Sequence, residues 1–218
     1  MIKRVVQPVQ FFLMCWLLWL IVVMGLLLFF PKGVLELEWN KYHTSFLDSF
    51  FLIVTDLGNG IAFLIVVLIL LFFDRVFFYI ALTTSIICLI VTFLMKQFFF
   101  VRAKRPLSYF DDSANIHLPE GAERLFYNSF PSGHTLAAFA MFLLVTYFLK
   151  NKMLQLLFFM MAALIGFSRV YLMAHFIEDV WFGSFLGVLI SFSVIFLFQN
   201  YFSFSNSSPL IRIYGKRK

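Results

Sequence analysis

The chain has 218 residues, of which 62% are hydrophobic and only 13% are charged. This composition excludes an ordinary soluble domain, which needs more polar surface, and is typical of an integral membrane protein. The formal net charge of +6 does not indicate nucleic-acid binding, because the basic residues stand in short clusters between apolar segments. Such clusters suit membrane orientation and contact with anionic lipid head groups.

Six apolar segments approach or exceed the roughly 20 residues that a helix needs to cross a bilayer. In chain order they cover residues 10–30, 49–73, 76–100, 132–149, 153–173 and 178–199. The first is too long for the core of a cleaved signal peptide, and no small-residue cleavage site follows it, so we expect a retained helix. The sequence therefore predicts an all-α bundle of six transmembrane helices, with residues 1–218 forming one membrane domain.

The connecting segments predict which helices are neighbours. "DR" at 74–75 and "KNK" at 150–152 are minimal turns, so the helices on either side of each should be antiparallel. The connections at residues 31–48 and 101–131 are longer than these turns. If six helices cross the membrane, both connections lie on the same side of it as residues 168–179. Residues 34–48 mix Trp, Tyr and Leu with charged side chains, which is typical of a short amphipathic helix at the membrane interface.

The distribution of Lys and Arg predicts the orientation. Nine of them lie on the side of both termini and eight on the other side. Five of those eight crowd around one candidate site, namely Lys96, Arg102, Lys104, Arg105 and Arg169. With these set aside, the positive-inside rule predicts cytoplasmic termini and a site on the outer face, as expected in a bacterial inner membrane.

The motif "PSGHT" at residues 131–135 opens the fourth apolar segment. Ser132 is a preferred N-cap residue, and the free backbone N–H groups of a helix N-terminus suit an anion. Gly133 lets the backbone approach that anion closely, and His134 stands in the first turn. The alternative explanation is a plain capped helix with an interfacial histidine.

The stretch "SRVYLMAHFIED" at residues 168–179 stands between the last two apolar segments. In a helix His175 and Asp179 would share one face, so the carboxylate could hold one imidazole nitrogen and raise the basicity of the other. Arg169 offers a planar fork suited to phosphate oxygens. A structural His–Asp pair is the alternative, but ionisable groups at such depth are costly and usually functional.

The third cluster, "KQFFFVRAKRP" at residues 96–106, could by itself be a basic anchor beside lipid head groups. Together, however, the three clusters combine fixed cations, a helix N-terminus and two histidines. Cations and N–H groups can neutralise a phosphoryl group, a paired histidine can attack phosphorus, and the other can protonate the leaving oxygen. No acidic cluster typical of a magnesium or calcium site is present in the sequence, so we expect no metal.

These stretches resemble the three signature motifs of the type 2 phosphatidic acid phosphatase superfamily. PSGH matches in full at 131–134, and S-R-x5-H-x3-D matches in full from Ser168 to Asp179. The first motif, K-x6-R-P, fits imperfectly, because eight residues separate Lys96 from Arg105. A bulge in the loop would explain the two extra residues; alternatively, Arg102 or Lys104 contributes the charge.

The resemblance implies that His175 is the nucleophile and forms a phosphohistidine, that Asp179 orients it, and that His134 is the general acid. It also implies a metal-independent and cofactor-independent reaction. The phosphoryl oxygens would be held by Lys96, Arg105, Ser132, Gly133 and Arg169.

The expected function is removal of a terminal phosphate from a lipid phosphate or diphosphate at the outer membrane face. A polyprenyl diphosphate, such as undecaprenyl diphosphate, is favoured over phosphatidylglycerophosphate, phosphatidate or lipid A. Phosphotransfer to an acceptor other than water, and an anion transporter built on the same charges, are the alternatives. The bilayer is the expected partner, and no nucleic acid or obligatory protein partner is expected.

Other ionisable residues receive plainer interpretations. Cys15 and Cys88 lie inside apolar segments and are expected to pack as small hydrophobic residues. Asp56 is expected to serve helix packing or capping, and Glu178 to face solvent. A solvated outer loop is expected to hold Asp111, Asp112, His117, Glu120, Glu123 and Arg124.

Overall fold

The computed structural model describes residues 2–111 and 114–201, and all regular structure within them is helical. The expected all-α class is therefore confirmed for this part of the chain. The helices are α1 (Ile2–Val6), η1 (Gln7–Val9), α2 (Gln10–Phe29), α3 (Val34–Asn40), α4 (Ser45–Asp56), α5 (Gly60–Phe73), α6 (Arg75–Leu94), η2 (Met95–Phe99), α7 (Pro106–Tyr109), α8 (Gly133–Leu149), α9 (Lys152–Tyr171) and α10 (Ile177–Tyr201).

Several of these helices are long and apolar enough to cross a membrane. Four meet that description among the described residues: Gln7–Phe29, Arg75–Phe99, Lys152–Tyr171 and Ile177–Tyr201. The pair α4 and α5 gives a fifth if the two are taken as one bent span. The remaining apolar helix, α8, has 17 residues and is shorter than a typical span. The chain is a multi-pass membrane protein, but helix length does not establish the expected count of six.

The segment expected as one helix over residues 49–73 is divided in the structure. Helix α4 ends at Asp56 and α5 begins at Gly60, with a bend of 49° between them. The new helix starts there because the side chain of Asn59 accepts a hydrogen bond from the backbone N–H of Ala62 at 2.9 Å. This break lies beside α8: a Cβ added at Gly58 would stand 3.2 Å from the backbone oxygen of His134.

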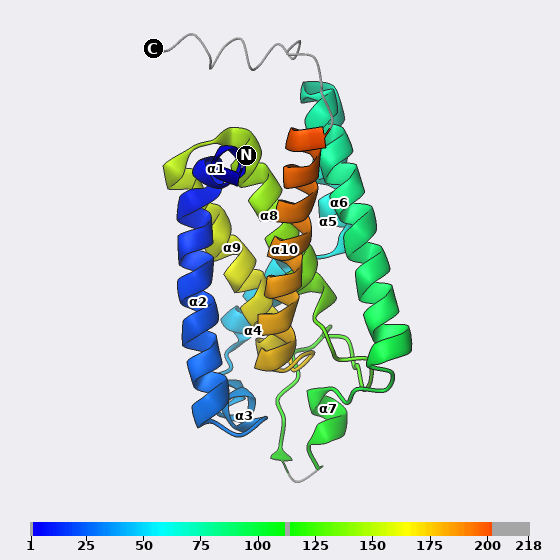
Figure 1. Cartoon of the computed structure of the whole chain (residues 1–218). Helices are drawn as coiled ribbons and strands as arrows, with labels where there is room; N and C mark the ends of the chain where they lie inside the picture. Colours follow the sequence, from blue (N-terminus) through cyan, green and yellow to red (C-terminus); the bar gives the residue numbers. More distant parts are fainter. Residues whose placement is uncertain (1, 112–113, 202–218) are drawn as a thin grey trace.

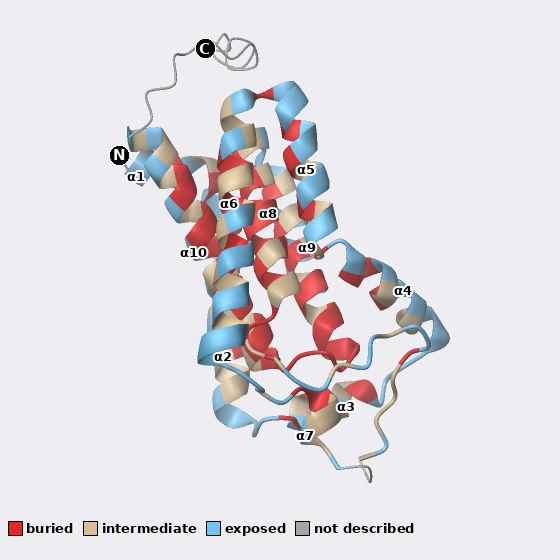
Figure 2. Ribbon diagram, turned by 90° about the vertical axis from the view of Figure 1, so that its right-hand side faces the viewer, coloured by how far each residue is buried: buried red, intermediate tan, exposed pale blue. Residues whose placement is uncertain are grey.

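The helices form a bundle with two distinct ends. Helix α1 and the last turn of α10 lie at one end, whereas α3, α7 and the connection from α6 to α8 lie at the other (Figure 1). Buried residues concentrate on α8 and on the facing parts of α9 and α10, while the outer faces of α2, α5 and α6 are largely exposed (Figure 2). Helix α8 is thus the centre of the bundle, and the exposed apolar faces around it suit contact with lipid tails.

Two glycines allow α10 to pack closely against α8. A Cβ at Gly183 would lie 2.7 Å from the backbone oxygen of Ser132, and one at Gly187 would lie 2.4 Å from that of Leu136. Their spacing of four residues places both on one face of α10. Small residues at this spacing let helix backbones approach each other in membranes. The arrangement holds α10 directly against the start of α8.

A buried glutamine fastens α2 to α9. The Gln155 side-chain oxygen accepts hydrogen bonds from the backbone N–H groups of Phe11 at 2.9 Å and Phe12 at 3.2 Å, while its amide nitrogen donates to the oxygen of Pro8 at 3.0 Å. Pro8 has no backbone N–H, and the chain passes from η1 into α2 shortly after it. The first backbone N–H groups of α2 have no partner within the helix. One side chain of α9 satisfies them.

The interfacial segment is shorter than expected. Residues 34–48 were expected to form one amphipathic helix, but α3 ends at Asn40 and α4 begins at Ser45. The second helix begins there because Thr44 caps it, accepting a hydrogen bond from the backbone N–H of Leu47 at 3.2 Å. Helix α3 itself is anchored by Glu36, whose side chain accepts a hydrogen bond from the backbone N–H of Ile177 at 2.8 Å. Glu36 therefore helps to satisfy the N-terminus of α10.

Candidate active site

The three sequence motifs meet at the end of the bundle that holds α3 and α7. The first runs from η2 through the loop before α7, the second opens α8, and the third occupies the turn from α9 into α10 (Figure 1). Backbone contacts join them directly. Ser132 donates its backbone N–H to the carbonyl oxygen of Asp179 at 3.1 Å, and Ser129 donates its own to that of Ala103 at 3.1 Å.

His175 and Asp179 form a buried pair, each with 1% of its surface exposed. The imidazole Nδ1 lies 3.2 Å from Asp179 Oδ2, so the expected pairing is confirmed. It does not arise along a helix face, however, because α10 begins only at Ile177. Asp179 instead caps its own helix, accepting the backbone N–H of Phe176 at 3.0 Å, and meets His175 in the preceding turn.

A second contact of the ring defines the tautomer of His175. Nε2 lies 3.3 Å from Nη1 of Arg105. A guanidinium can only donate, so Nε2 is the unprotonated acceptor and Nδ1 carries the hydrogen that is directed to Asp179. The assignment follows from the hydrogen-bond pattern. It leaves the lone pair on Nε2, the nitrogen opposite the carboxylate.

The surroundings of His175 keep it neutral. Burial lowers the pKa of the imidazole well below its ordinary value, and the charges of Arg105, Lys96 and Arg169 lower it further. A neutral imidazole at pH 7 retains the lone pair that a nucleophile requires. The ring is thus prepared electrostatically as well as geometrically.

Arg105 is a structural tie as well as a cation. Nε donates to the carbonyl oxygen of Tyr127 at 2.8 Å, Nη1 to that of Ala174 at 2.8 Å, and Nη2 to that of Asn128 at 3.2 Å. With the contact to His175, most of its five N–H donors already face protein acceptors. Burial lowers the pKa of its guanidinium, although an arginine remains charged. Arg105, expected to bind phosphate, therefore joins the loop before PSGH to the turn before α10.

Arg169 is the less occupied arginine. It is 5% exposed, and its Nη1 donates to Thr55 Oγ1 at 2.6 Å. Its Nε has no hydrogen-bond partner among the described residues. A buried guanidinium with an unpaired N–H is a suitable receptor for an anion. Thr55, at the end of α4, was not identified from the sequence, because the contact joins segments 114 residues apart.

Ser132 and His134 occupy the start of α8 as expected. Ser132 is the N-cap: its Oγ accepts the backbone N–H of Thr135 at 3.4 Å and the Thr135 hydroxyl at 2.9 Å. Gly133 follows as the first helical residue, so its N–H points out of the helix end. His134 is half-buried and lines two cavities, one of about 350 Å³ and one of about 460 Å³.

Lys96 lies within η2, a π-helical turn over Met95–Phe99. A π turn accommodates an extra residue relative to an α turn, and the loop after it bends sharply at Arg102, where φ is 61°. These two features accommodate the longer spacing of the first motif. Lys96 is half-buried and its charge helps to lower the pKa of His175, whereas Arg102 and Lys104 are exposed. The arrangement favours Lys96 over either alternative.

Ser129 is a site residue that sequence reasoning missed. It is 1% exposed, donates its hydroxyl to Asp179 Oδ2 at 2.5 Å, and lies 3.5 Å from His175 Nδ1. The only signal in the sequence is its place two residues before Pro131. Asp179 Oδ2 thus faces three donors, from Ser129, His175 and Phe176, which fix the position of the carboxylate.

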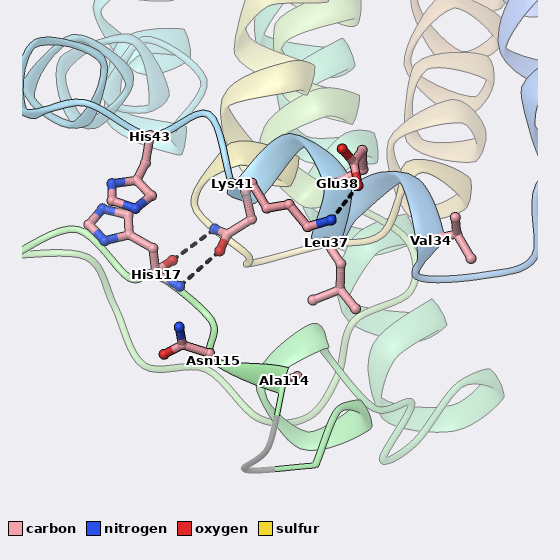
Figure 3. Close-up of a pocket in the computed structure, with 9 residues that line it drawn as sticks. Val34, Leu37, Glu38, Lys41, His43, Ala114, Asn115 and His117 are labelled. Atoms are coloured by element: carbon pink, nitrogen blue, oxygen red, sulfur yellow. Dashed lines mark hydrogen bonds and ion pairs between the residues drawn. The ribbon is translucent and has the colours of Figure 1, made fainter.

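The outer loop is more ordered than expected around His117. Its backbone exchanges two hydrogen bonds of 2.8 Å with the side-chain amide of Asn40, and its Nε2 lies 3.0 Å from Asp48 Oδ2. Its ring stacks on that of His43, with centroids 3.6 Å apart (Figure 3). The expectation of a solvated position is therefore wrong for this residue. Of the other residues expected in the solvated loop, Asp111, Glu120, Glu123 and Arg124 are exposed, while Asp112 lies outside the described residues.

Three further expectations can be compared with the structure. Glu178 is half-buried and paired with Lys32, so it does not simply face solvent. Asp56 is exposed and makes no side-chain hydrogen bond with the described residues, so it is not a cap. Cys88 is buried and Cys15 is half-buried, and both are free thiols.

Comparison with known proteins identifies the family. The family model described as the PAP2 superfamily matches residues 76–203, which is more than half of the chain. The chain belongs to the PAP2 superfamily. The matched region contains all three motifs of the site, so the resemblance inferred from them is confirmed.

Other members resemble the chain over different extents. Phosphatidylglycerophosphatase B of Bacillus subtilis is 40% identical over 75 residues, which cover 30% of this chain and 37% of that protein. Two solved structures share the fold. LpxE of Aquifex aeolicus has a TM-score of 0.68 at 24% identity, covering 77% of this chain and 96% of LpxE. The phosphatidylglycerolphosphate phosphatase of Bacillus subtilis has a TM-score of 0.56 at 22% identity, covering 92% of this chain and all of that one.

Proposed function

We propose that this PAP2 protein is a membrane hydrolase that removes the terminal phosphate from a lipid phosphate or diphosphate. One observation carries the proposal. His175 is buried, neutral and held between Asp179 and Arg105, with its lone pair on Nε2. This geometry prepares a nucleophile beside cations and the N-terminus of α8, an environment that suits a phosphoryl group.

In the proposed first step, His175 Nε2 attacks phosphorus, an N–P bond forms, and the bond from phosphorus to the lipid oxygen breaks. His134 donates the proton that the leaving oxygen requires, and Asp179 stabilises the imidazolium form of His175. Water then attacks the phosphohistidine with His134 as the base, releasing phosphate and restoring the ring. The contact between Arg105 and Nε2 must be given up for the attack, so Arg105 N–H donors become available to the phosphoryl group as His175 reacts.

The phosphoryl oxygens are proposed to lie between the N-terminus of α8 and the cationic side chains. The backbone N–H groups of Ser132 and Gly133 do not contribute equally, because that of Ser132 already donates to Asp179. Ser132 therefore contributes mainly by capping α8, and Gly133 by its N–H at the helix end. The cations proposed to hold the oxygens are Lys96, Arg105 and Arg169.

The lipid tail is proposed to lie in the apolar cavity beside His134. This cavity of about 460 Å³ is lined by residues of α5, α6 and α8, among them Phe63, Leu89 and Leu136. Helices α5 and α6 have exposed apolar outer faces, so the cavity lies beside the surface that suits lipid. A tail there would lie beside His134, the proposed acid for the leaving oxygen.

We propose that six spans cross the membrane, counting α4 with α5 as one and α8 as another, with cytoplasmic termini and the site at the outer face of a bacterial inner membrane. The distribution of Lys and Arg supports this orientation. Cysteine labelling tests it: Glu120→Cys, at an exposed position of the outer loop, should react with an impermeant reagent in intact cells. Lys152→Cys, at the opposite end of the bundle, should react only after lysis; the reverse pattern would invert the topology.

Phosphate release from defined lipid phosphates tests the function. The purified protein should release inorganic phosphate in EDTA, because the proposed steps use side chains alone. His175→Ala should abolish release, whereas His43→Ala, which changes an exposed histidine outside the motifs, should not. If His175→Ala retains turnover, the mechanism is wrong. A phosphorylated acceptor with little free phosphate would instead show phosphotransfer.

The substrate panel should include both classes that the sequence and the relatives indicate. Sequence reasoning favoured a polyprenyl diphosphate, whereas the relative with the matched 75 residues is named a phosphatidylglycerophosphatase. A phosphate monoester on a glycerol or sugar unit and a polyprenyl diphosphate share the proposed phosphoryl site. They differ in the group on the other side of the cleaved bond. In the monoester this group is a neutral glycerol or sugar unit, and in the diphosphate it is a second, anionic phosphate.

A further inference from the structure

Two carboxylates that the proposed mechanism does not use stand beside the phosphoryl site. Asp56, at the end of α4, and Glu123, in the outer loop, both line the polar cavity of about 350 Å³. The same cavity is lined by His134 and Arg169. The two acids come from segments far apart in the chain, and the fold brings both to one cavity with His134 and Arg169.

Both acids are exposed, and within the described part of the chain their oxygens accept from no protein donor. Neither makes a side-chain hydrogen bond or an ion pair with any described residue. Both interact electrostatically with Arg169, and Glu123 also with Arg105, so they lie near the site without being directly paired to it. An ionised carboxylate is an acceptor only, so these groups can receive hydroxyl donors from a ligand.

Arg169 provides an independent sign of a ligand in this cavity. It is 5% exposed and its Nε has no partner among the described residues, although Thr55, which lines the same cavity, holds its Nη1. A buried, incompletely paired guanidinium is costly unless an anion completes its hydrogen bonds. An anion bound to Arg169 would therefore lie in the cavity that Asp56 and Glu123 also line.

We propose that this cavity binds a neutral polyhydroxyl unit next to the cleaved phosphate, and that its hydroxyls donate to Asp56 and Glu123. The inference rests on the proposed function and defines its substrate class: a phosphate monoester of a glycerol-like or sugar-like lipid head group. A polyprenyl diphosphate would instead place a second phosphate beside two carboxylates, where like charges repel. The two acids thus select by attraction to hydroxyls and by repulsion of a second anion.

Purified full-length protein and three lipid probes of matched tail length test the proposal. One carries a terminal phosphate on a free-hydroxyl glycerol unit, the second is a diacylglycerol phosphate without that unit, and the third is a polyprenyl diphosphate. The first should have the highest kcat/KM. Because a site that hydrogen-bonds a hydroxyl rejects the analogue lacking it, we expect the first probe to exceed the second by about tenfold or more.

Asp56→Asn with Glu123→Gln should reduce kcat/KM for the first probe by about tenfold or more while improving turnover of the diphosphate. Each single variant should show part of the change, so the test survives if the double variant fails to fold. Glu120→Gln, an exposed acid of the same loop outside the cavity, is the matched control. An unchanged ratio between the probes in all acid variants overturns the proposal.

The same experiment separates this inference from the proposed function. If the unsubstituted protein hydrolyses no lipid phosphate, or if His175→Ala remains active, the proposed function fails. If hydrolysis depends on His175 but the diphosphate is preferred and the acid variants leave that preference intact, only the substrate class is wrong.

Discussion

At the scale of single residues, three side chains hold His175 in place. Arg105 contacts Nε2, Asp179 accepts from Nδ1, and Ser129 donates to the same carboxylate oxygen. Each contact restricts either the orientation of the ring or its tautomer. The sequence motifs predicted the His–Asp pair and the cations, but Ser129 and Thr55 became visible only through contacts between distant segments, which no spacing rule encodes.

Ser129→Ala should slow the reaction without weakening substrate binding. The hydroxyl donates to a buried carboxylate, and such a bond contributes roughly 1.5–3 kcal/mol, so we expect kcat to fall by about 10- to 100-fold. KM should change little, because Ser129 acts on Asp179 and not on the proposed phosphoryl ligands. Ser191→Ala is the matched control, since that buried hydroxyl has no partner among the described residues. If kcat fell equally in both variants, the proposed action of Ser129 on Asp179 would be wrong.

The lowered pKa of His175 predicts a dependence of stability on pH. The folded state keeps the imidazole neutral, whereas the unfolded chain takes up a proton as the pH falls through about 6.5. The free energy of unfolding should therefore fall below that pH. His175→Gln removes this titration and should show a smaller loss of thermal stability in detergent between pH 7 and pH 5. Identical losses in both proteins would show that the folded pKa is not lowered.

At the scale of elements, the centre of the bundle is fixed by close helix packing. Apolar segment lengths predicted the long helices, and the N-cap rule placed the start of α8 at Ser132. The break between α4 and α5 was missed although "TDLGNG" contains its signals, because the flanking apolar residues read as one membrane segment. The role of Gly183 and Gly187 was also missed, since their importance lies in the distance between two backbones.

Gly187→Ala should destabilise the protein. The added methyl group would stand 2.4 Å from the backbone oxygen of Leu136, so α10 must move away from α8. Overpacking of this kind costs about 1–3 kcal/mol, and thermal unfolding should shift downward accordingly. Gly25→Ala in α2 is the control, because no atom lies within 4 Å of the added group. Equal unfolding temperatures for both variants would contradict the close packing.

Helix α3 should hold the turn that carries His175. Glu36 accepts the backbone N–H of Ile177, and burial raises the pKa of its carboxyl group. Glu36→Leu removes the acceptor and leaves a buried N–H unpaired, which costs about 1–3 kcal/mol. We expect lower thermal stability together with reduced kcat, whereas Glu36→Gln, which keeps an acceptor oxygen, should restore most of both. If Glu36→Gln were no more stable and no more active than Glu36→Leu, the capping role of Glu36 would be wrong.

At the scale of the whole molecule, His134 stands where an apolar cavity and a polar cavity meet. The apolar one is lined by α5, α6 and α8, and the polar one by the end of α4, the outer loop and the turn before α10. Sequence reasoning predicted the chemistry of the site because the motifs are local. It could not predict the two cavities, because their walls combine segments that only the tertiary arrangement brings together.

The central claim is that His175 carries the phosphoryl group during turnover, and trapping that intermediate tests it most directly. The protein should be mixed with a lipid carrying a radiolabelled terminal phosphate and quenched in alkali within a single turnover. We expect an acid-labile, alkali-stable label that maps to His175 and is absent from His175→Ala. Steady turnover without such a label, or a label on another residue, would contradict it.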